Sequence, residues 1–494
     1  MHPAQPPKPS RRAVLGGIAA AGAATALGSF TGRASTAHAA TAAGTYTVRF
    51  DQARRQTIKG LGVEIQADSI GSGNNGLPDT VSGVPLDLTP AERTRFYAEI
   101  LKGTRSDRGF RYCRLAMGLY YRGLDPTRKL MQDRYPGQRA LLADMQDRGG
   151  LEGMAVEYWS PAPGWKSSNS FVGGRLKSFE PAFLSEFGDA LVADLDHLRA
   201  GGLRISHWGL QNEPAYGDLD YSSCTYSPQE YLATFKAVAP KIRAAYPDVL
   251  IHAESLDGWT KGIGQALKAD AEAMRYVDAW TFHHLHDANA DKQLANNYTS
   301  GALGKPVFSN EFEYLDGPAS DRRCINNAQS IMNWMTFQES PTWFWLHALK
   351  PIANAEASGY SLGFWRPPND TDFSRFPDLA PGHWTYNQQN WNGIAGFVKY
   401  MPWDSVRYTV DESQVRLDQR IMAWKTAAGK AVVALTNRSA TDSFTFTIDT
   451  QTAATFQGNR YTPQARNTNL GTKSGPTLTV TLPPHSVEFW IRTP

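Results

Sequence analysis

The chain has few cysteines for its length, three in 494 residues. Three thiols allow at most one intramolecular disulfide, and their spacing fits no zinc-binding pattern. Cys113 stands inside an apolar run, which indicates a buried free thiol. Cys224 and Cys324 each follow a segment with candidate site residues, so a bridge between them and two separate free thiols are both left open.

Clusters of lysine and arginine interleaved with aromatic residues are also lacking, which argues against a nucleic-acid partner. The formal net charge of +3 comes from the N-terminus, because residues 1–39 hold four cations, Lys8, Arg11, Arg12 and Arg33, and no acid. Without them the charge is about −1. No internal repeat or low-complexity segment follows, and nothing in the charge pattern favours a membrane surface as partner.

A run long and apolar enough for a membrane anchor is absent from the N-terminus. The stretch to Phe30 is rich in Ala and Gly and falls short of about 18 strongly apolar residues. It follows the twin arginine Arg11 and Arg12 and precedes the small-residue pattern "AHA" at 37–39. We therefore expect residues 1–39 to be a removable twin-arginine signal peptide and the mature protein to be secreted, with no membrane contact after cleavage.

Apolar and aromatic residues are plentiful, and the length suits a large α/β barrel with a smaller partner domain. Eight β-rich runs alternate with segments of helical period: "TIKGLGVEI", "FRYCRLAMG", "EGMAVEYW", "HWGLQNEP", "DVLIHAES", "VDAWTFHHLH", "KPVFSNEFEY" and "PTWFWLHAL". Eight parallel strands with crossover helices close a (β/α)8 TIM barrel, which we expect over residues 57–398. Capping boxes at 89–92 ("TPAE") and 227–230 ("SPQE") predict two helix starts.

The last hundred residues have a different sequence pattern. Short alternating segments such as "KAVVALTNRS" and "DSFTFTID" are separated by turn residues, which predicts a β-sandwich domain over 399–494. "TYTVRF" at 45–50 has the same two-residue alternation. We expect residues 40–56 to add an N-terminal strand to that sandwich.

Two segments of similar design carry the candidate chemistry, "HWGLQNEPAYG" at 207–217 and "KPVFSNEFEYL" at 305–315. Glu213 ends the fourth run and Glu311 the seventh. Side chains at the carboxyl ends of barrel strands gather on one rim, so the two carboxylates are expected to face each other across a bound sugar. We predict Glu213 as acid/base and Glu311 as nucleophile; a retaining mechanism requires carboxyl groups about 5 to 5.5 Å apart.

"LQNEP" at 210–214 and "KPVFSNEF" at 305–312 resemble the acid/base and nucleophile signatures of the retaining (β/α)8 glycosidase clan. "YWSPAPGWKSSNS" at 158–170 is similar to the stretch after strand three in glycoside hydrolase family 30, which also carries a side β-sandwich built from both chain ends. The resemblance covers nearly all of the mature chain. It implies a secreted glycoside hydrolase that needs no cofactor and no metal.

Carried over by position, the resemblance implies that Asn212 binds the sugar 2-hydroxyl and that Arg114 holds the nucleophile. His283 and Trp345 would line the same subsite, with Trp345 as a stacking floor. Two departures stand out. Asn310 precedes the nucleophile where the clan usually has Thr or Ser, and the first strand, "GLGVEIQAD", lacks the common glycine-phenylalanine-glycine start.

Several other residues compete for roles. Glu313 lies on the same strand face as Glu311 by alternation, and we prefer Glu311 for its spacing from Lys305. Glu64 and Glu254 also end strands and are expected to be binding or structural. Four tryptophans fit core packing as well as sugar platforms: Trp159, Trp165, Trp208 and Trp280. Trp165 and His284 join the candidate substrate-binding residues.

Two alternatives remain. His284 and His286 of "FHHLH" share a strand face, as in metal-dependent TIM-barrel hydrolases, but the His-X-His of the first strand and the late Asp of those enzymes are missing. The other alternative is a carbohydrate-binding protein whose barrel binds a glycan without cleaving it. We expect a monomer with a carbohydrate substrate, and galactan, glucan, xylan and fucosyl or glucuronyl glycosides are all candidates. Loops 72–85 and 365–384 would decide between endo and exo action.

Overall fold

The computed structural model describes residues 42–51, 54–65, 88–103, 109–217, 221–284, 298–312, 322–352, 361–367 and 370–494. The predicted signal peptide and loop 72–85 lie outside these residues, as does Glu313. Among the described residues, no helix has the length and apolar character needed to span a bilayer.

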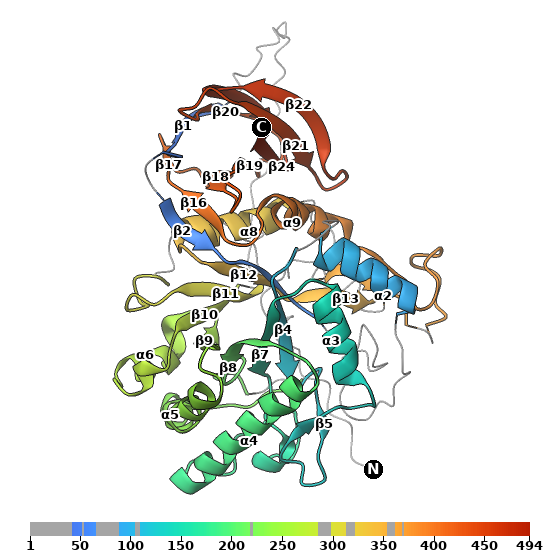
Figure 1. Ribbon diagram of the computed structural model, residues 1–494, viewed down its shortest axis with the longest axis vertical. Coiled ribbons are helices and arrows are strands. Elements are labelled where there is room, and N and C mark those ends of the chain that lie inside the picture. Colours follow the sequence, from blue (N-terminus) through green and yellow to red (C-terminus); the bar gives the residue numbers. More distant parts are fainter. Residues whose placement is uncertain are drawn as a thin grey trace, which may run out of the picture. The chain divides into compact units, whose positions relative to one another are not determined.

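All eight predicted barrel strands are present, and they close into one barrel (Figure 1). In order along the chain they are β3 (Gly60–Glu64), β4 (Tyr112–Met117), β7 (Gly153–Tyr158), β8 (Ile205–Gly209), β9 (Leu250–Leu256), β10 (Ala279–His284), β11 (Val307–Phe312) and β12 (Thr342–Trp345). Every neighbouring pair is parallel, and β12 closes the ring by pairing with β3. The predicted TIM barrel is confirmed.

Helices and short turns connect these strands. The α-helices are α2 (Pro90–Phe96), α3 (Gln138–Arg148), α4 (Pro181–Ala200), α5 (Pro228–Ala245), α6 (Ile263–Lys268), α8 (Arg323–Phe337) and α9 (Gln388–Tyr400), and α2 runs on into a π-helical turn, Tyr97–Leu101. Ser227 and Glu230 form the predicted capping box of α5. At α2 only half of the predicted box forms: Thr89 caps the helix, while Glu92 pairs with Arg95 instead of reaching back.

The β-sandwich has two sheets drawn from both ends of the described chain. The four-stranded sheet has the order β17 (Val410–Glu412), β1 (Ala42–Val48), β20 (Phe444–Asp449), β23 (Thr477–Leu482). The seven-stranded sheet has the order β2 (Arg54–Ile58), β16 (Ser405–Tyr408), β18 (Gln419–Lys425), β19 (Ala431–Asn437), β24 (Ser486–Arg492), β21 (Thr455–Tyr461), β22 (Thr468–Ser474). β1, in the segment that the alternation of "TYTVRF" assigned to the sandwich, pairs with β20 across some 400 residues of sequence.

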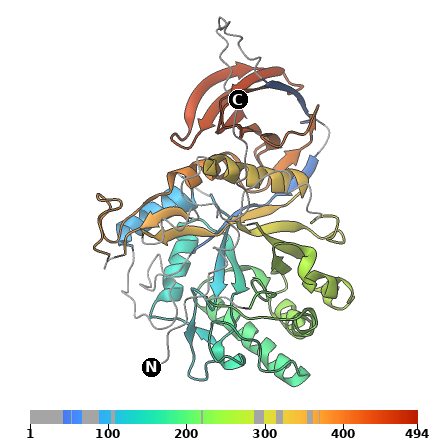
Figure 2. The ribbon, with the colours of Figure 1, turned by 180° about the vertical axis from the view of Figure 1, so that it is seen from behind.

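One apolar core joins the two sheets of the sandwich. Phe446 and Val480 of the smaller sheet pack with Val433 and Trp490 of the larger one. Helices α8 and α9 lie between this domain and the barrel strands, as Figure 2 also shows from behind. The indole of Trp424 in β18 donates a hydrogen bond to the carbonyl of Tyr400 at the end of α9. The barrel and the sandwich are thus packed directly on each other.

An excursion after β12 carries the second predicted loop. It holds β13 (His347–Pro351), β14 (Ser361–Trp365) and β15 (Trp384–Tyr386), which form a small sheet, and a β-hairpin elsewhere pairs β5 (Gly123–Leu124) with β6 (Met131–Gln132). Arg366 is fully buried and donates to the carbonyls of Leu379 at 2.6 Å and Asp372 at 2.5 Å. These bonds, with two more to the carbonyls of Arg375 and Phe376, fold the loop compactly around one guanidinium.

Candidate active site

The barrel interior is layered. Near the amino ends of the strands it is filled by an apolar cluster of Tyr112, Ala155, Ala279, Phe308 and Phe344. Side chains on a strand face repeat every second residue. Two residues further along β4 and β7, the interior therefore receives Arg114 and Glu157, and β11 adds Asn310. The candidate site is built from this second, polar layer.

Glu213 stands just beyond β8 in a left-handed backbone conformation, with φ of 46°. Its backbone N–H donates to the carbonyl of Ser255 at 3.2 Å, which fixes the turn against β9. One side-chain oxygen accepts a hydrogen bond from the Tyr221 hydroxyl at 3.2 Å, and Nδ1 of His283 lies 3.2 Å from the other. The carboxyl group is buried and held from two sides.

Glu311 comes from β11, where the pairing with β10 shifts register between Phe282 and His283. The irregularity turns two consecutive residues inward: Asn310 donates to Glu157, and Glu311 accepts from Arg114 Nη1 at 2.5 Å. Nε2 of His283 lies 3.7 Å from the same Glu311 oxygen. The two-residue alternation that placed Glu311 and Glu313 on the same strand face therefore does not hold along this bulged strand.

The two predicted catalytic carboxylates converge. One oxygen each of Glu213 and Glu311, with one nitrogen of His283, all lie within 4.8 Å of one another. Burial would lower the pKa of His283, but the charge of Glu311 and the hydrogen bond and charge of Glu213 outweigh it and raise the pKa above its ordinary value. The imidazolium form is therefore favoured between two carboxylates.

Arg114 is the hub of the site. Its guanidinium contacts three buried carboxylates: Glu157 through Nε at 2.9 Å, Glu64 through Nη1 at 3.0 Å, and Glu311. Nη2 donates to Oδ1 of Asn212 at 2.5 Å. Burial would lower the pKa of Arg114, but the three carboxylates raise it above its ordinary value. The Arg114 cation thus contacts Glu311, the predicted nucleophile, and Asn212, which precedes the predicted acid/base Glu213.

The structure brings together Glu213 and Glu311, whose convergence the strand positions predicted, and Arg114, Asn212 and His283, which the resemblance implied. Glu64 joins them through Arg114. Glu254 does not: it faces α6, where burial raises the pKa of its carboxyl to about 8 against the opposing backbone hydrogen bond of Gly264. Of the two predicted roles for Glu254, the structural one fits.

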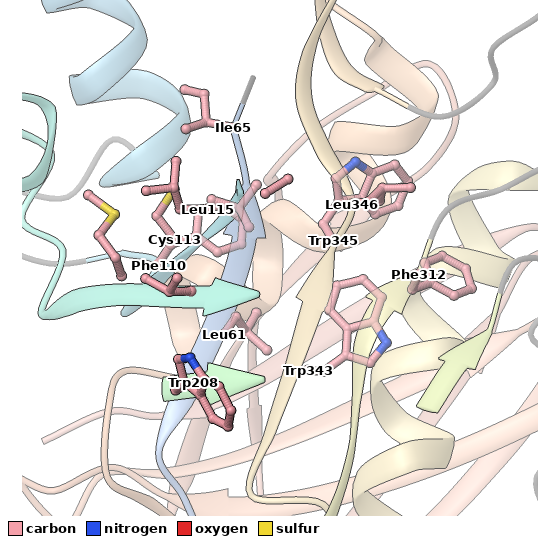
Figure 3. Close-up of a cluster of buried hydrophobic side chains, with 14 of the residues drawn as sticks. Leu61, Ile65, Phe110, Cys113, Leu115, Trp208, Phe312, Trp343, Trp345 and Leu346 are labelled. Carbon is pink, nitrogen blue, oxygen red and sulfur yellow. The ribbon is translucent and has the colours of Figure 1, made fainter. Parts of the chain in front are cut away.

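The predicted tryptophan contacts differ. Trp345 is fully buried and packs on Phe312 and Trp343 (Figure 3). Its indole N–H donates to the carbonyl of His347 at 2.7 Å. It offers no surface to a sugar here, and its role as a stacking floor stays a prediction. Trp165 packs against Phe183 and Phe187 of α4 and bonds the Lys129 carbonyl, so the structure assigns it to packing outside the barrel interior rather than to substrate binding.

Trp208 and Trp280 are fully buried in the main core. Trp159 is the tryptophan near the site: its ring lies 5.7 Å from the Arg114 guanidinium and 5.5 Å from the Tyr221 ring. The backbone of His284 ends β10, and its side chain lies outside the described residues.

The possible bridge between Cys224 and Cys324 does not form. All three cysteines are free and buried, Cys113 among them as predicted. Cys324 is buried in α8, where its carbonyl lies against Gly393 of α9. Cys224 lies in the segment after β8, within the electrostatic reach of Lys166 and Arg175. Both cysteines follow strands that carry site residues, but Cys224 is buried in the loop after β8 and Cys324 is buried in helix α8.

Three residues of the site were not predicted from the sequence: Glu157, Ser255 and Tyr221. Glu157 carries a usable signal, because it stands two residues after Ala155 on a strand whose inner face fills the barrel. Ser255 and Tyr221 carry none. Ser255 enters through a bulge in β9, and Tyr221 through a loop, and neither follows strand periodicity.

No family model and no curated protein matches the chain. Among solved structures, the catalytic domain of GH30 xylanase C from Talaromyces cellulolyticus is similar with a TM-score of 0.66 at 16% identity, covering 91% of this chain and 100% of that one. An endo-β1,6-glucanase aligns with a TM-score of 0.65 at 16% identity over 91% and 95% of the two chains.

A conserved exported protein from Bacteroides fragilis aligns with a TM-score of 0.68 at 14% identity over 90% of this chain and 100% of that one. These identities are low, while the shared architecture extends over nearly the whole described chain. The protein therefore has the fold of the glycoside hydrolase family 30 structures, a (β/α)8 barrel with a β-sandwich at its side.

Proposed function

We propose that the protein is a retaining β-glycoside hydrolase that cleaves a β-linked polysaccharide or oligosaccharide by double displacement. The observation that carries this proposal is the approach of the Glu213 and Glu311 oxygens to within 4.8 Å. Retaining enzymes hold their two carboxyl groups about 5 to 5.5 Å apart, whereas inverting enzymes leave about 6.5 to 9.5 Å for a water molecule. The fold shared with a GH30 xylanase and an endo-β1,6-glucanase is consistent with it.

In the first step, Glu311 attacks the anomeric carbon while Glu213 donates a proton to the leaving oxygen. Arg114 donates a hydrogen bond to Glu311 and holds its carboxylate in position for the attack. When Glu213 has given up its proton, the Tyr221 hydroxyl at 3.2 Å and the His283 ring at 3.2 Å can both hydrogen-bond the carboxylate that remains. In the second step, Glu213 takes a proton from water, which then releases the sugar from Glu311. Asn212, placed by Arg114, would bind the 2-hydroxyl.

The test is release of reducing ends from a panel of xylan, β-1,6-glucan, β-galactan and other β-glucans. We expect Glu311→Gln to abolish turnover and Glu213→Ala to slow the second step, with rescue by azide, which needs no base. Glu186→Gln, on the exposed side of α4, is the matched control and should keep the wild-type rate. Near-normal rates in both site variants would contradict the proposal.

A metal-dependent hydrolase is a second candidate, because Glu213, His283 and Glu311 form the one group among the described residues whose spacing would suit a metal ion. The short contact of Arg114 with Glu311 places a cation where such an ion would compete. Dialysis against a chelator should leave the rate unchanged, whereas loss of activity restored by zinc would favour the metal. Binding of a panel polysaccharide without cleavage would favour a non-catalytic carbohydrate-binding protein.

We also propose that the chain is exported by its twin-arginine leader. Support comes from the Arg11 and Arg12 pair and the following apolar stretch. Replacing both arginines by lysine should retain the precursor inside the cell, and unchanged secretion of the mature chain would argue against this route.

A further inference from the structure

Glu157 is a buried carboxylate that the proposed mechanism does not use. It stands near the end of β7 with an exposed fraction of 1%. Taking a carboxylate out of water costs several kcal/mol unless it is paired and fully hydrogen-bonded. The surrounding side chains provide this. Arg114 donates to it from Nε and Nη2, Asn310 donates from Nδ2 at 3.0 Å, and the Ser255 hydroxyl donates to its other oxygen.

These partners lead to both catalytic carboxylates. On one side, Arg114 binds Glu311 directly, and Asn310 is the residue before Glu311 in β11. On the other side, the carbonyl of Ser255 accepts the backbone N–H of Glu213. Glu157 is therefore linked to the predicted nucleophile, Glu311, through Arg114 and to the predicted acid/base, Glu213, through Ser255.

The link through Ser255 depends on a strained piece of backbone. In the pairing of β9 with β10, Thr281 faces Glu254 and Phe282 faces Leu256, so Ser255 is the extra residue of a bulge. Glu254 and Ser255 both have positive φ, 85° and 46°. Such conformations are strained for residues other than glycine and persist where surrounding contacts hold them. The hydroxyl of Ser255, bonded to Glu157 and 2.8 Å from that of Thr281, supplies those contacts.

The charge of Glu157 also matters. It is one of three carboxylates that share the single guanidinium of Arg114. Burial would raise the pKa of Glu157, but Arg114, His252, His283 and the Ser255 hydroxyl lower it to about 2, so it stays ionised at any working pH. The charged and titratable groups that face it are Arg114, Glu64, His252, His283, Glu311 and, from α5, Tyr231.

We propose that Glu157 is a positioning residue that sets both the spacing of Glu213 and Glu311 and the field that Arg114 exerts on Glu311. The inference rests on the proposed function. It also explains why Asn310 precedes the nucleophile: its amide bonds Glu157 and the Ser255 hydroxyl, joining β11 to β7 and β9.

The test compares Glu157→Gln with Glu64→Gln on the panel polysaccharide that the wild type cleaves fastest. Both variants remove one negative charge from Arg114, so in both the acid limb of the kcat/KM profile should move to lower pH. Only Glu157→Gln also loosens Asn310 and Ser255. Because misplacement of about 1 Å costs on the order of 10²-fold in rate, we expect a loss of that size in kcat for Glu157→Gln and a smaller loss for Glu64→Gln.

Ser255→Ala keeps the proposal testable if Glu157→Gln fails to fold. It breaks the contact to Glu157 and leaves every charge in place, so kcat should fall about tenfold or more while the acid limb stays where it is. Ser206→Ala is its control, since the Ser206 hydroxyl bonds the carbonyl of Met154 near the amino end of β7. All rates are measured well below each variant's melting temperature.

The outcomes separate this inference from the function it rests on. If the wild type is active and Glu311→Gln is dead, the proposed function stands. Wild-type kcat and an unshifted pH profile in Glu157→Gln would then overturn the positioning role alone, as would a loss confined to thermal stability. An inactive wild type would instead count against the proposed function.

Discussion

The two ends of the barrel interior are made by the same strands and hold opposite chemistry. On β4, Tyr112 faces the amino-end layer and Arg114 the layer above it. On β7 the corresponding residues are Ala155 and Glu157. A step of two residues thus separates an apolar plug from a cluster of buried charges.

The lower layer is uncharged throughout. His207 of β8 packs edge-on against Tyr112 and Phe308, and burial lowers its pKa to about 3, so it is neutral at ordinary pH. The side chains of this layer carry no charge, so their burial requires no partner of opposite charge. The upper layer is stable only as a complete network, because each charge there depends on its neighbours. The plug supports the barrel, and the network above it holds the residues that we propose to be catalytic.

The largest effect is expected from removing the cation of the upper layer. Arg114→Met leaves Glu64 and Glu157 buried without the guanidinium that pairs them, and leaves Glu311 with His283 alone beside it, which should cost about 3 to 5 kcal/mol of unfolding free energy and abolish turnover. The ionised form of Glu157, whose pKa is lowered to about 2 in the folded protein, contributes stability above its unfolded pKa that is lost as pH falls. In the variant this dependence should reverse, with stability rising on acidification. Urea unfolding at pH 5 and pH 7 measures both.

The lower layer should respond in stability alone. Phe344→Ala removes a ring from the plug and should cost about 3 to 5 kcal/mol of unfolding free energy. At a temperature where the variant is folded, kcat should stay within a few-fold of the wild type. A selective loss of kcat comparable with that of the upper-layer variants would show that the two layers are not separable.

A buried acid outside the barrel interior gives an effect on stability that depends on pH. Asp194 of α4 accepts hydrogen bonds from the Met131 N–H and the Tyr158 hydroxyl, yet burial raises its pKa to about 8. Its neutral form therefore contributes stability at low pH that is lost as pH rises toward about 8, with a slope of up to about 1.4 kcal/mol per pH unit. Asp194→Asn should lack this decline. Melting temperatures from pH 5 to 9 test it, and parallel curves for the two proteins would refute it.

The smallest effect concerns the outward face of the same strands. Cys113 lies between Tyr112 and Arg114 and points away from the interior into the apolar core. Burial raises the pKa of all three thiols, that of Cys224 to about 11. A thiol reagent should label none of them in the native protein and three after denaturation. Rapid labelling of the native chain would contradict the packing.

Much of this comparison was predictable from the sequence, because each barrel strand carries its own pattern. The eight runs predicted the strands, and the position of Glu213 and Glu311 after two of them predicted their convergence. Glu157 was within reach of the same periodicity. The bulges that turn Ser255, Asn310 and Glu311 into the barrel interior were not predictable, because they depend on the register with a neighbouring strand. The same holds for Trp345, whose surroundings are set by Phe312 and Trp343.

The central claim is that Glu213 and Glu311 act together on one sugar by double displacement. The most direct test is proton NMR of the product in the first minutes of cleavage, before mutarotation. The account predicts that the β-anomer of the new reducing end appears first and converts slowly to the equilibrium mixture. An α-anomer as first product would show inversion and contradict the account.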